Sequence, residues 1–309
     1  MAAEDESASR LDAVRSIDLS DAETRAGLLF AAPYLVIFSI FLLYPLVLGF
    51  YMSLFEWNVF APAESEFIGL DNYIRMVQDP VFWSAFRATV YFVALTVPTL
   101  VVFGLVLALG VNHNIKGKRF LRTVYFSPYV LTVSVVSLIW MELYASDYGP
   151  LNYYLGFFIS DPPVWLNSFT WAMPAVAFAT VWWTVGFNFI ILLAARQSVP
   201  ERLYEAARID GASSWRAFRD ITLPQMRPAI MFVSVVQFIW SFQVFGQVFV
   251  MTDGGPGNST QTIIMYLYRV AFRQQEFGYA AAIGYFLFFV LVAVSLANYY
   301  FIGREEDTS

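Results

Sequence analysis

The sequence has few charged residues and no cysteine. Only 14% of its 309 residues are charged, whereas 59% are hydrophobic; a soluble domain has roughly a quarter charged residues. Without cysteine, the chain can form no disulfide, no thiolate nucleophile and no cysteine-ligated zinc or iron–sulfur site. A single histidine, His113, excludes a histidine-rich metal site.

The sequence also lacks the residue patterns that bind nucleotides and nucleic acids. No segment reads GxxxxGK[ST], so the chain has no P-loop; we expect no cofactor in this chain, and any ATP-driven work, with its ATP and magnesium, must come from a partner protein. With 18 basic and 24 acidic residues, the chain offers little to phosphate backbones, so we expect no nucleic-acid partner.

Charge is absent from six long runs. They lack Asp, Glu, Lys and Arg over 19 to 34 residues each, and a membrane-spanning helix needs roughly 20. The runs predict an all-α membrane protein with one six-span domain, 26–303, between polar tails at 1–25 and 304–309. The predicted spans are about 27–51, 87–111, 122–144, 170–195, 228–251 and 278–302.

The basic residues predict the orientation. If both termini are cytoplasmic, 14 of the 18 Lys and Arg residues lie inside and four lie outside. Basic residues concentrate on the cytoplasmic side of membrane proteins. The sequence therefore predicts a multi-pass protein of the cell membrane, embedded in lipid, with N- and C-termini in the cytoplasm.

The internal loop 196–227 has a helical pattern of its own. Ser198 followed by Glu201 predicts a capping box, and Gly211 predicts the left-handed residue that ends this first helix. Ser213 or Ser214 then predicts the start of a second short helix, which we expect to end at Leu223-Pro224. Such a helix–glycine–helix loop either packs on its own bundle or docks against a partner.

The spacing of this loop resembles the EAA loop of binding-protein-dependent ABC importer permeases. The matching positions are Glu205, Ala206 and Ala207, then Gly211, then Ile221-x-Leu223-Pro224. The segments 67–73 (FIGLDNY) and 252–256 (TDGGP) are similar to loops of the carbohydrate-uptake branch, the maltose and glycerol-3-phosphate permease group.

The resemblance implies a non-catalytic permease with the type I importer fold. Its implied partners are a second homologous permease subunit, two ATP-binding subunits and an extracytoplasmic solute-binding protein. It also implies that the EAA helix contacts an ATP-binding subunit. The residues expected to couple the permease to that subunit are Glu205, Ala206, Ala207, Gly211, Trp215, Leu223 and Pro224.

Polar residues inside spans mark a pathway or join helices. Thr180, Thr184 and Asn188 share one face of the fourth span, and Gln237 and Ser241 share a face of the fifth. Gln243 and Gln247 lie on another face of the fifth span. The resemblance implies that Thr184, Gln237 and Ser241 face a sugar, so we predict Thr180, Thr184, Asn188, Gln237 and Ser241 as pathway residues.

Three classes of function remain. An ATP-driven sugar permease explains the loop; an ion- or proton-driven carrier and a transferase acting on lipid-linked sugars do not. No titratable pair lies within a span, which disfavours proton coupling. Within the permease class, glycerol-3-phosphate or a polyol is the alternative substrate, but the charge-free runs supply no cation for a phosphate, so a neutral sugar is preferred.

The orientation can be tested with single cysteines, because the chain has none of its own. We expect a membrane-impermeant thiol reagent to label intact cells with cysteine at Glu64 or Pro256, but not at Gly117 or Ser214. Labelling at position 214, or failure at both outer positions after a labelled control, would contradict the six-span topology.

Overall fold

The computed structural model describes residues 22–112 and 117–303, and their side chains over 25–112 and 117–297. The predicted tail 304–309 and most of the predicted tail 1–25 lie outside the described residues, as does His113. The described chain is mainly helical, with one two-stranded sheet.

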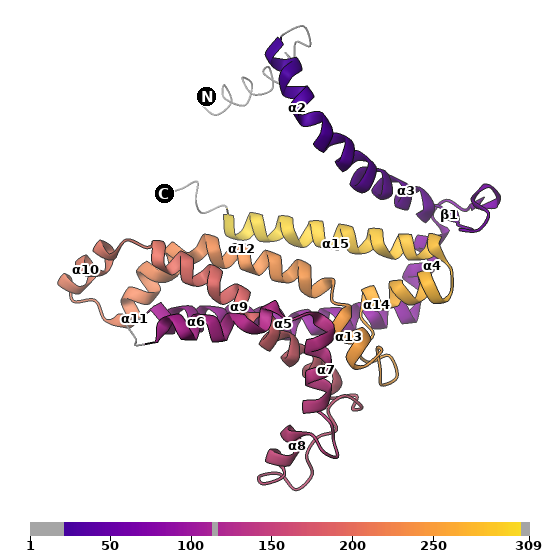
Figure 1. Ribbon diagram of the computed structural model, residues 1–309. Coiled ribbons are helices and arrows are strands. Elements are labelled where there is room, and N and C mark those ends of the chain that lie inside the picture. The colour runs from indigo at the N-terminus through magenta and orange to yellow at the C-terminus, as the bar shows by residue number, and fades with distance from the viewer. Residues whose placement is uncertain (1–21, 113–116, 304–309) are drawn as a thin grey trace.

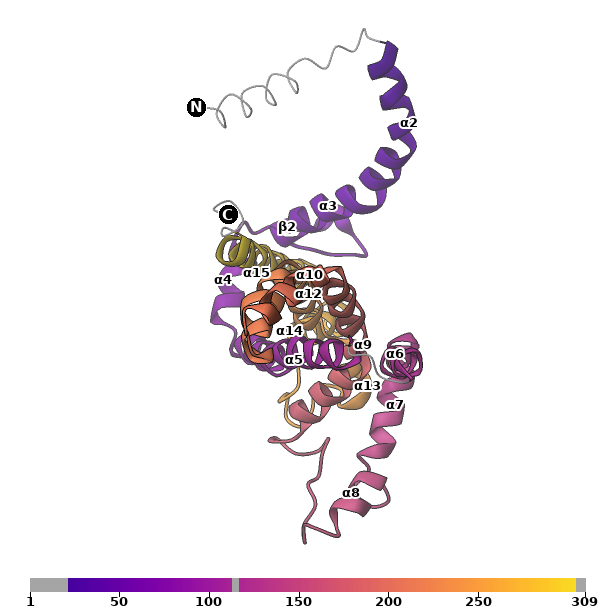
Figure 2. The same cartoon turned by 90° about the vertical axis from the view of Figure 1, so that its left-hand side faces the viewer.

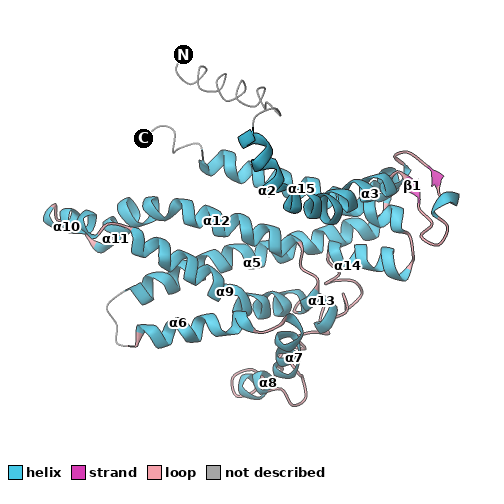
Figure 3. Cartoon of the chain, turned by 45° about the horizontal axis from the view of Figure 1, so that its top comes forward, coloured by secondary structure: helices cyan, strands magenta, loops and turns pink. Residues whose placement is uncertain are grey.

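Four long helices pack side by side as the body of the protein (Figure 1): α5 (Pro80–Asn112), α9 (Ala172–Ser198), α12 (Leu223–Phe242) and α15 (Phe277–Gly303). Buried residues of α5 recur every three or four positions, which places them on one face against α9 and α12. Figure 3 shows the loop helices α10 (Glu201–Ile209) and α11 (Ser214–Ala217) at one end of this body. Helices α5 and α15 cover the predicted spans 87–111 and 278–302, and α9 covers the predicted span 170–195 from Ala172 onward.

The first predicted span is a helix that leaves the body (Figure 2). It consists of α2 (Ala22–Phe38), the π-helical turn η1 (Ser39–Leu43) and α3 (Tyr44–Ser53). Only its second half is packed: α3 lies against α15, where the Tyr285 hydroxyl donates to the Leu46 carbonyl. The most apolar 18-residue window of the segment is wholly unburied.

A small hairpin and a surface helix follow at the opposite end from the loop helices. Strand β1 (Phe55–Glu56) pairs antiparallel with β2 (Glu66–Phe67) around the 3-10 turn η2 (Pro62–Glu64), and α4 (Asp71–Gln78) comes next. Gly69, with φ +60°, makes the turn into α4. The buried Asn72 amide donates to the carbonyls of Ser53 and Phe55 at 2.9 and 3.0 Å, so α4 is fixed to the end of α3.

The third predicted span, 122–144, corresponds to a sharply bent segment and not to one continuous helix. Helix α6 (Lys118–Phe126) and the 3-10 turn η3 (Ser127–Val130) meet α7 (Val133–Leu143) at an angle of 100°. Pro128 lacks an N–H, and Leu131 adopts an extended conformation, so the helical ladder stops there. The Trp183 indole donates to the Leu131 carbonyl at 3.1 Å, which satisfies one group that the break releases.

The fifth predicted span, 228–251, is also different. Residues 218–222 form a π-helical turn, η4 (Phe218–Thr222), that runs into α12 without a break, so Leu223-Pro224 does not end the second loop helix. The widened turn shifts the hydrogen-bond ladder and accommodates the proline. Helix α12 then ends at Phe242, and α13 (Gly246–Met251) follows after a break at 243–245.

By length and composition, four described helices are long and apolar enough to cross a membrane: the segment from α2 to α3, α5, α9 and α15. The number is five if the bent pair of α6–η3 and α7 counts as one span. The remaining elements lie outside these helices: α8 (Pro150–Leu155), α14 (Ile263–Tyr268) and the π-helical turn η5 (Arg269–Arg273).

Asp79 joins three helices at the hairpin end. Its Oδ1 accepts from the Val81 N–H at 2.8 Å, and its Oδ2 accepts from the Tyr279 hydroxyl at 2.7 Å and from the Tyr266 hydroxyl. Burial raises the pKa of Asp79, but these hydrogen bonds outweigh burial and leave the pKa below its ordinary value. The carboxylate thus fixes the start of α5 to α14 and α15.

We expect Tyr279→Phe to lower the free energy of unfolding at pH 7 by about 1–2 kcal/mol, because the ionised Asp79 loses a donor. Since the folded-state pKa lies below the unfolded value of about 3.9, this stabilisation is present above that pH and is lost as pH falls through the folded-state pKa. Thermal unfolding of the detergent-purified protein at pH 7 and at pH 3 measures it.

The matched control is Tyr268→Phe, whose hydroxyl makes no hydrogen bond to Asp79. Equal losses for the two variants, or a loss that persists unchanged at pH 3, would show that the Asp79 network does not stabilise the fold in this way.

Candidate functional site

A cavity of about 470 Å³ lies between α9 and α12. It extends along the break at 243–245 and is bordered on other sides by α5 and η3. None of its lining residues is charged: they are Phe92, Tyr129, Thr180, Trp183, Thr184, Gln237, Trp240, Ser241, Gln243, Val244, Phe245, Gly246 and Gln247. Its polar groups are hydroxyls and amides, which suit an uncharged, hydroxyl-rich ligand.

Four of the five predicted pathway residues are on the wall of this cavity. Thr180 and Thr184 come from α9, and Gln237 and Ser241 from α12. The two threonine hydroxyls donate to carbonyls one turn earlier in α9, each at 2.8 Å, and each oxygen keeps lone pairs to accept a further hydrogen bond. Ser241 accepts from Thr96 of α5 at 3.0 Å.

Asn188 is the exception, because it does not line the cavity. It is fully buried behind Gln237, and its Oδ1 accepts a hydrogen bond from Gln237 Nε2 at 3.0 Å. The structure thus joins two predicted residues from different helices, but only one of them can reach a ligand.

The sequence reasoning missed the aromatic part of the wall. Trp183 and Trp240 lie beside the predicted polar residues, and Tyr129 comes from the bent segment. Gln243 and Gln247 also line the cavity, although a straight helix places them on a different face from Gln237. The break after Phe242 turns the chain and brings both faces to one cavity.

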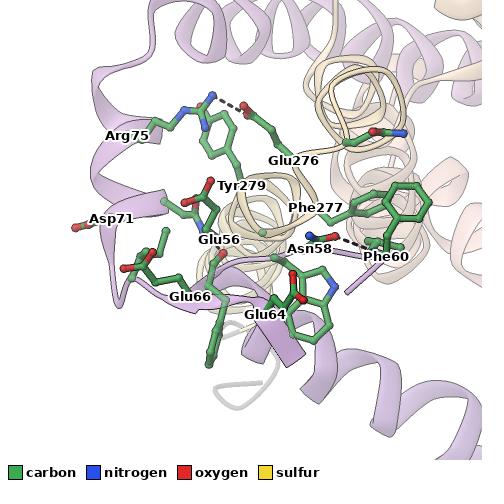
Figure 4. A pocket seen from close by; sticks show the side chains of 17 residues that line it. Glu56, Asn58, Phe60, Glu64, Glu66, Asp71, Arg75, Glu276, Phe277 and Tyr279 are labelled. Carbon is green, nitrogen blue, oxygen red and sulfur yellow. Dashed lines mark hydrogen bonds and ion pairs between the residues drawn. The ribbon is translucent and has the colours of Figure 1, made fainter. Parts of the chain in front are cut away.

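A second cavity, of about 780 Å³, opens among the hairpin, α4 and the start of α15 (Figure 4). Arg75 pairs with Glu276 at 2.7 Å, and its guanidinium lies 4.3 Å from the centre of the Tyr279 ring. Four further carboxylates line the cavity: Glu56, Glu64, Glu66 and Asp71. No group of three or more acidic or histidine side chains in the described part of the chain can hold a metal ion.

The loop 196–227 contains the predicted glycine elbow. Gly211 has φ +73°, and the N–H groups of Gly211 and Ala212 donate back to Arg208 and Ala207 at 3.1 and 2.9 Å. These two hydrogen bonds form a Schellman cap at the end of α10. The Ser213 hydroxyl accepts from the Arg216 N–H at 3.3 Å and so caps α11.

The predicted capping box at Ser198 is wrong. Helix α9 continues to Ser198, whose hydroxyl donates backwards to the Ala195 carbonyl at 2.8 Å. Pro200 is the N-cap residue of α10 and provides no side-chain cap. Ser198 is therefore part of the preceding helix.

One side of the loop packs on the bundle and the other is exposed. The Tyr204 hydroxyl is 2.8 Å from the Thr222 hydroxyl, and Leu203, Tyr204 and Ile221 pack against the buried cluster at this end of α5, α9 and α12. On the other side, Ile209 is 87% exposed and Trp215 is 69% exposed. Of the predicted coupling residues, Ala207 is half-buried and the others are exposed: Glu205, Ala206, Gly211, Trp215, Leu223 and Pro224.

Residues 81–304 match the family described as the binding-protein-dependent transport system inner membrane component. This chain belongs to that family. The diacetylchitobiose uptake system permease protein NgcF of Streptomyces coelicolor is 39% identical over 279 residues, with 85% of this chain and 76% of NgcF covered. The lactose transport system permease protein LacF of Rhizobium radiobacter is 33% identical, with 91% and 94% covered.

The trehalose/maltose transport system permease protein MalF of Thermococcus litoralis is also 33% identical, with 91% of this chain and 95% of MalF covered. Among solved structures, a bacterial ABC transporter that imports alginate gives a TM-score of 0.76 at 23% identity, with 91% of this chain and 96% of that chain covered. The chain therefore has the ABC importer permease fold. The permease family predicted from the EAA spacing is confirmed.

Proposed function

We propose that this permease carries a neutral sugar, of disaccharide size, across the cell membrane in an ATP-driven importer. The uncharged cavity between α9 and α12 is the observation that supports this most. Threonine, serine and glutamine groups there can exchange hydrogen bonds with hydroxyls, and Trp183 and Trp240 offer apolar rings to sugar faces. The relatives NgcF, LacF and MalF, which are named for the uptake of diacetylchitobiose, lactose and trehalose or maltose, support the same class of substrate.

The lack of charge in the cavity and in the spans disfavours glycerol-3-phosphate and an ion-driven carrier. Glycerol-3-phosphate brings a phosphate, for which buried recognition uses cationic or charge-assisted donors. The lining contains none. An ion-driven carrier needs an intramembrane charge for its coupling ion, and the six charge-free runs supply none.

The chain crosses the membrane six times in our proposal, with both termini in the cytoplasm. The bent segment α6–α7 is the third crossing and the broken segment α12–α13 is the fifth. The excess of basic residues on the termini and on the loops near Lys118 and Arg208 supports this orientation. The hairpin and the acidic cavity of Figure 4 then lie outside the cell.

This orientation sets where each proposed partner would dock. The loop helices meet one of two subunits that bind ATP and magnesium, a second permease subunit completes the channel, and a solute-binding protein docks on the outer face. The alginate importer has been solved in complex with an alginate pentasaccharide-bound periplasmic protein, with a TM-score of 0.76 and 24% identity to this chain.

The loop that would contact the ATP-binding subunit is connected directly to the cavity wall. Helix α11, the turn η4 and α12 form one continuous helical segment, Ser214 to Phe242, from the loop to the cavity wall. Displacement of the loop by a closing ATP-binding subunit therefore moves Gln237 and Ser241 directly, because packed helices shift as rigid elements. The Schellman cap at Gly211 fixes α10 to this segment.

The test is uptake of labelled lactose, maltose, trehalose and diacetylchitobiose by the complete complex in liposomes, with or without internal ATP and with or without an ionophore that collapses ion gradients. We expect ATP-dependent uptake of at least one of the four. Uptake that follows an ion gradient without ATP, or preference for glycerol or glycerol-3-phosphate over all four, would contradict the proposal.

We expect Gly211→Val to release the ATP-binding subunit while the spans still insert. A β-carbon at this position meets no atom within 4 Å, so the cost comes from the φ of +73°, about 1–2 kcal/mol for a β-branched residue. Co-purification of the ATP-binding subunit and ATP hydrolysis stimulated by the loaded binding protein measure the effect.

Gly211→Asn is the control, since asparagine tolerates the left-handed region, and it should retain both activities. Wild-type values for Gly211→Val would show that the elbow does not hold the docking geometry.

We expect Gln237→Leu and Ser241→Val each to lower uptake about tenfold per assembled complex, because a hydroxyl of the bound sugar loses its hydrogen-bond partner. Basal ATP hydrolysis should stay near that of the wild type. Normal uptake per complex, with a lower yield of complex, would instead identify these residues as contacts between helices.

A further inference from the structure

Gln237 is held at its amide nitrogen by a residue that never reaches the cavity. Asn188 on α9 is 0% exposed and Gln237 on α12 is 2% exposed, and Gln237 Nε2 donates to Asn188 Oδ1 at 3.0 Å. Gln237 also lines the cavity, whereas Asn188 does not. Asn188 therefore contacts Gln237 without lining the cavity itself.

The hydrogen bond determines which end of the Gln237 amide a ligand meets. A glutamine amide can accept at its oxygen or donate from its nitrogen. With Nε2 turned to Asn188, the carbonyl Oε1 has no hydrogen-bond partner in the described part of the chain, and we infer that it is the end left for the cavity. This part of the wall then accepts a hydrogen bond, so it favours a ligand group that donates one, such as a hydroxyl.

Helix packing holds Asn188 in place. A β-carbon built on Gly104 of α5 would lie 2.8 Å from Asn188 Cβ, so glycine is what lets α5 approach Asn188. Asn188 Nδ2 is buried and has no hydrogen-bond partner in the described part of the chain. A buried polar group without a partner destabilises a fold, so stability alone does not explain an asparagine here.

We propose that Asn188 is a positioning residue that orients the Gln237 amide, with its carbonyl toward the cavity, and thereby selects a donating hydroxyl of the substrate. The proposal rests on the sugar pathway argued above. It assigns Asn188 no direct contact with the sugar, in contrast to its prediction as a pathway residue from the sequence.

The experiment is a double-mutant cycle on the complete complex in liposomes, with uptake of whichever of the four labelled disaccharides the wild type transports. Asn188→Leu keeps the side-chain size but removes the acceptor, and it should lower uptake per assembled complex roughly fivefold. If Asn188 acts through Gln237, the double variant with Gln237→Leu should match Gln237→Leu alone within about twofold. Independent roles would instead multiply to about fiftyfold.

Selectivity gives a second readout that a structural role would not change. Monodeoxyfluoro derivatives of the same sugar replace one hydroxyl with fluorine, which cannot donate. The wild type should discriminate most strongly against the derivative that lacks the donating hydroxyl. In Asn188→Leu the amide is free to turn its Nε2 to the ligand, so this discrimination should fall at least threefold, about 0.7 kcal/mol by the affinity relation.

The control and a second route separate the possible failures. Thr99→Val on α5 removes a hydroxyl that donates within its own helix at 2.6 Å and should leave uptake unchanged. Gly104→Ala displaces Asn188 without altering it and should reproduce the loss of selectivity.

Normal uptake and selectivity per complex in Asn188→Leu, with a reduced yield of complex, would overturn the positioning role while leaving the pathway intact. Normal uptake in Gln237→Leu itself would instead overturn the pathway on which the inference rests.

Discussion

Irregular backbone within membrane-spanning segments is stable only where the protein supplies its hydrogen-bond partners, because hydrocarbon offers none. The cavity between α9 and α12 depends on two such places. At the bend after η3, the Trp183 indole donates to the Leu131 carbonyl. At the break after α12, the Thr262 hydroxyl donates to the Val244 carbonyl at 2.9 Å. Without these breaks Tyr129 and Gln247 would not face the same space as Gln237.

The partners at these breaks come from segments far away in the chain. Trp183 lies 52 residues after Leu131, and Thr262 lies 18 residues after Val244. The bent crossings are therefore products of tertiary packing, and α9 acts both as a wall of the cavity and as a donor to the backbone of its neighbour. Helices α9 and α12 contribute equally to the polar wall, with Thr180 and Thr184 from α9 and Gln237 and Ser241 from α12.

The sequence could predict features that depend on one segment alone, but not features that depend on tertiary packing. Absence of charge over 88–115, 162–195 and 277–303 was sufficient to locate α5, α9 and α15, because desolvation of charge is a property of each segment alone. The bend near Pro128 was not predictable, since proline is tolerated in membrane helices when another helix satisfies the freed carbonyls. The sequence carries no local sign that Trp183 does so.

The candidate site shows the same limit at the level of side chains. Helical periodicity placed Asn188 and Gln237 on inward faces, but it could not tell which of them lies in front. That order depends on Gly104, a residue of a third helix that no pattern singled out. The glycine elbow at Gly211 was predictable because left-handed backbone is a local requirement. The cap at Ser198 was not, because α9 extends one turn further than its apolar run.

Helix α2 differs from the helices of the body, because very little of its surface packs within this chain. Its side chains are largely exposed, such as Phe30 at 86%, so within the proposed importer its position depends on lipid and on the proposed partner subunits. The packing of the body formed by α5, α9, α12 and α15 therefore depends little on α2. We therefore expect substitutions in α2 to change the stability of the assembled complex, whereas substitutions in α5 change the stability of the single subunit.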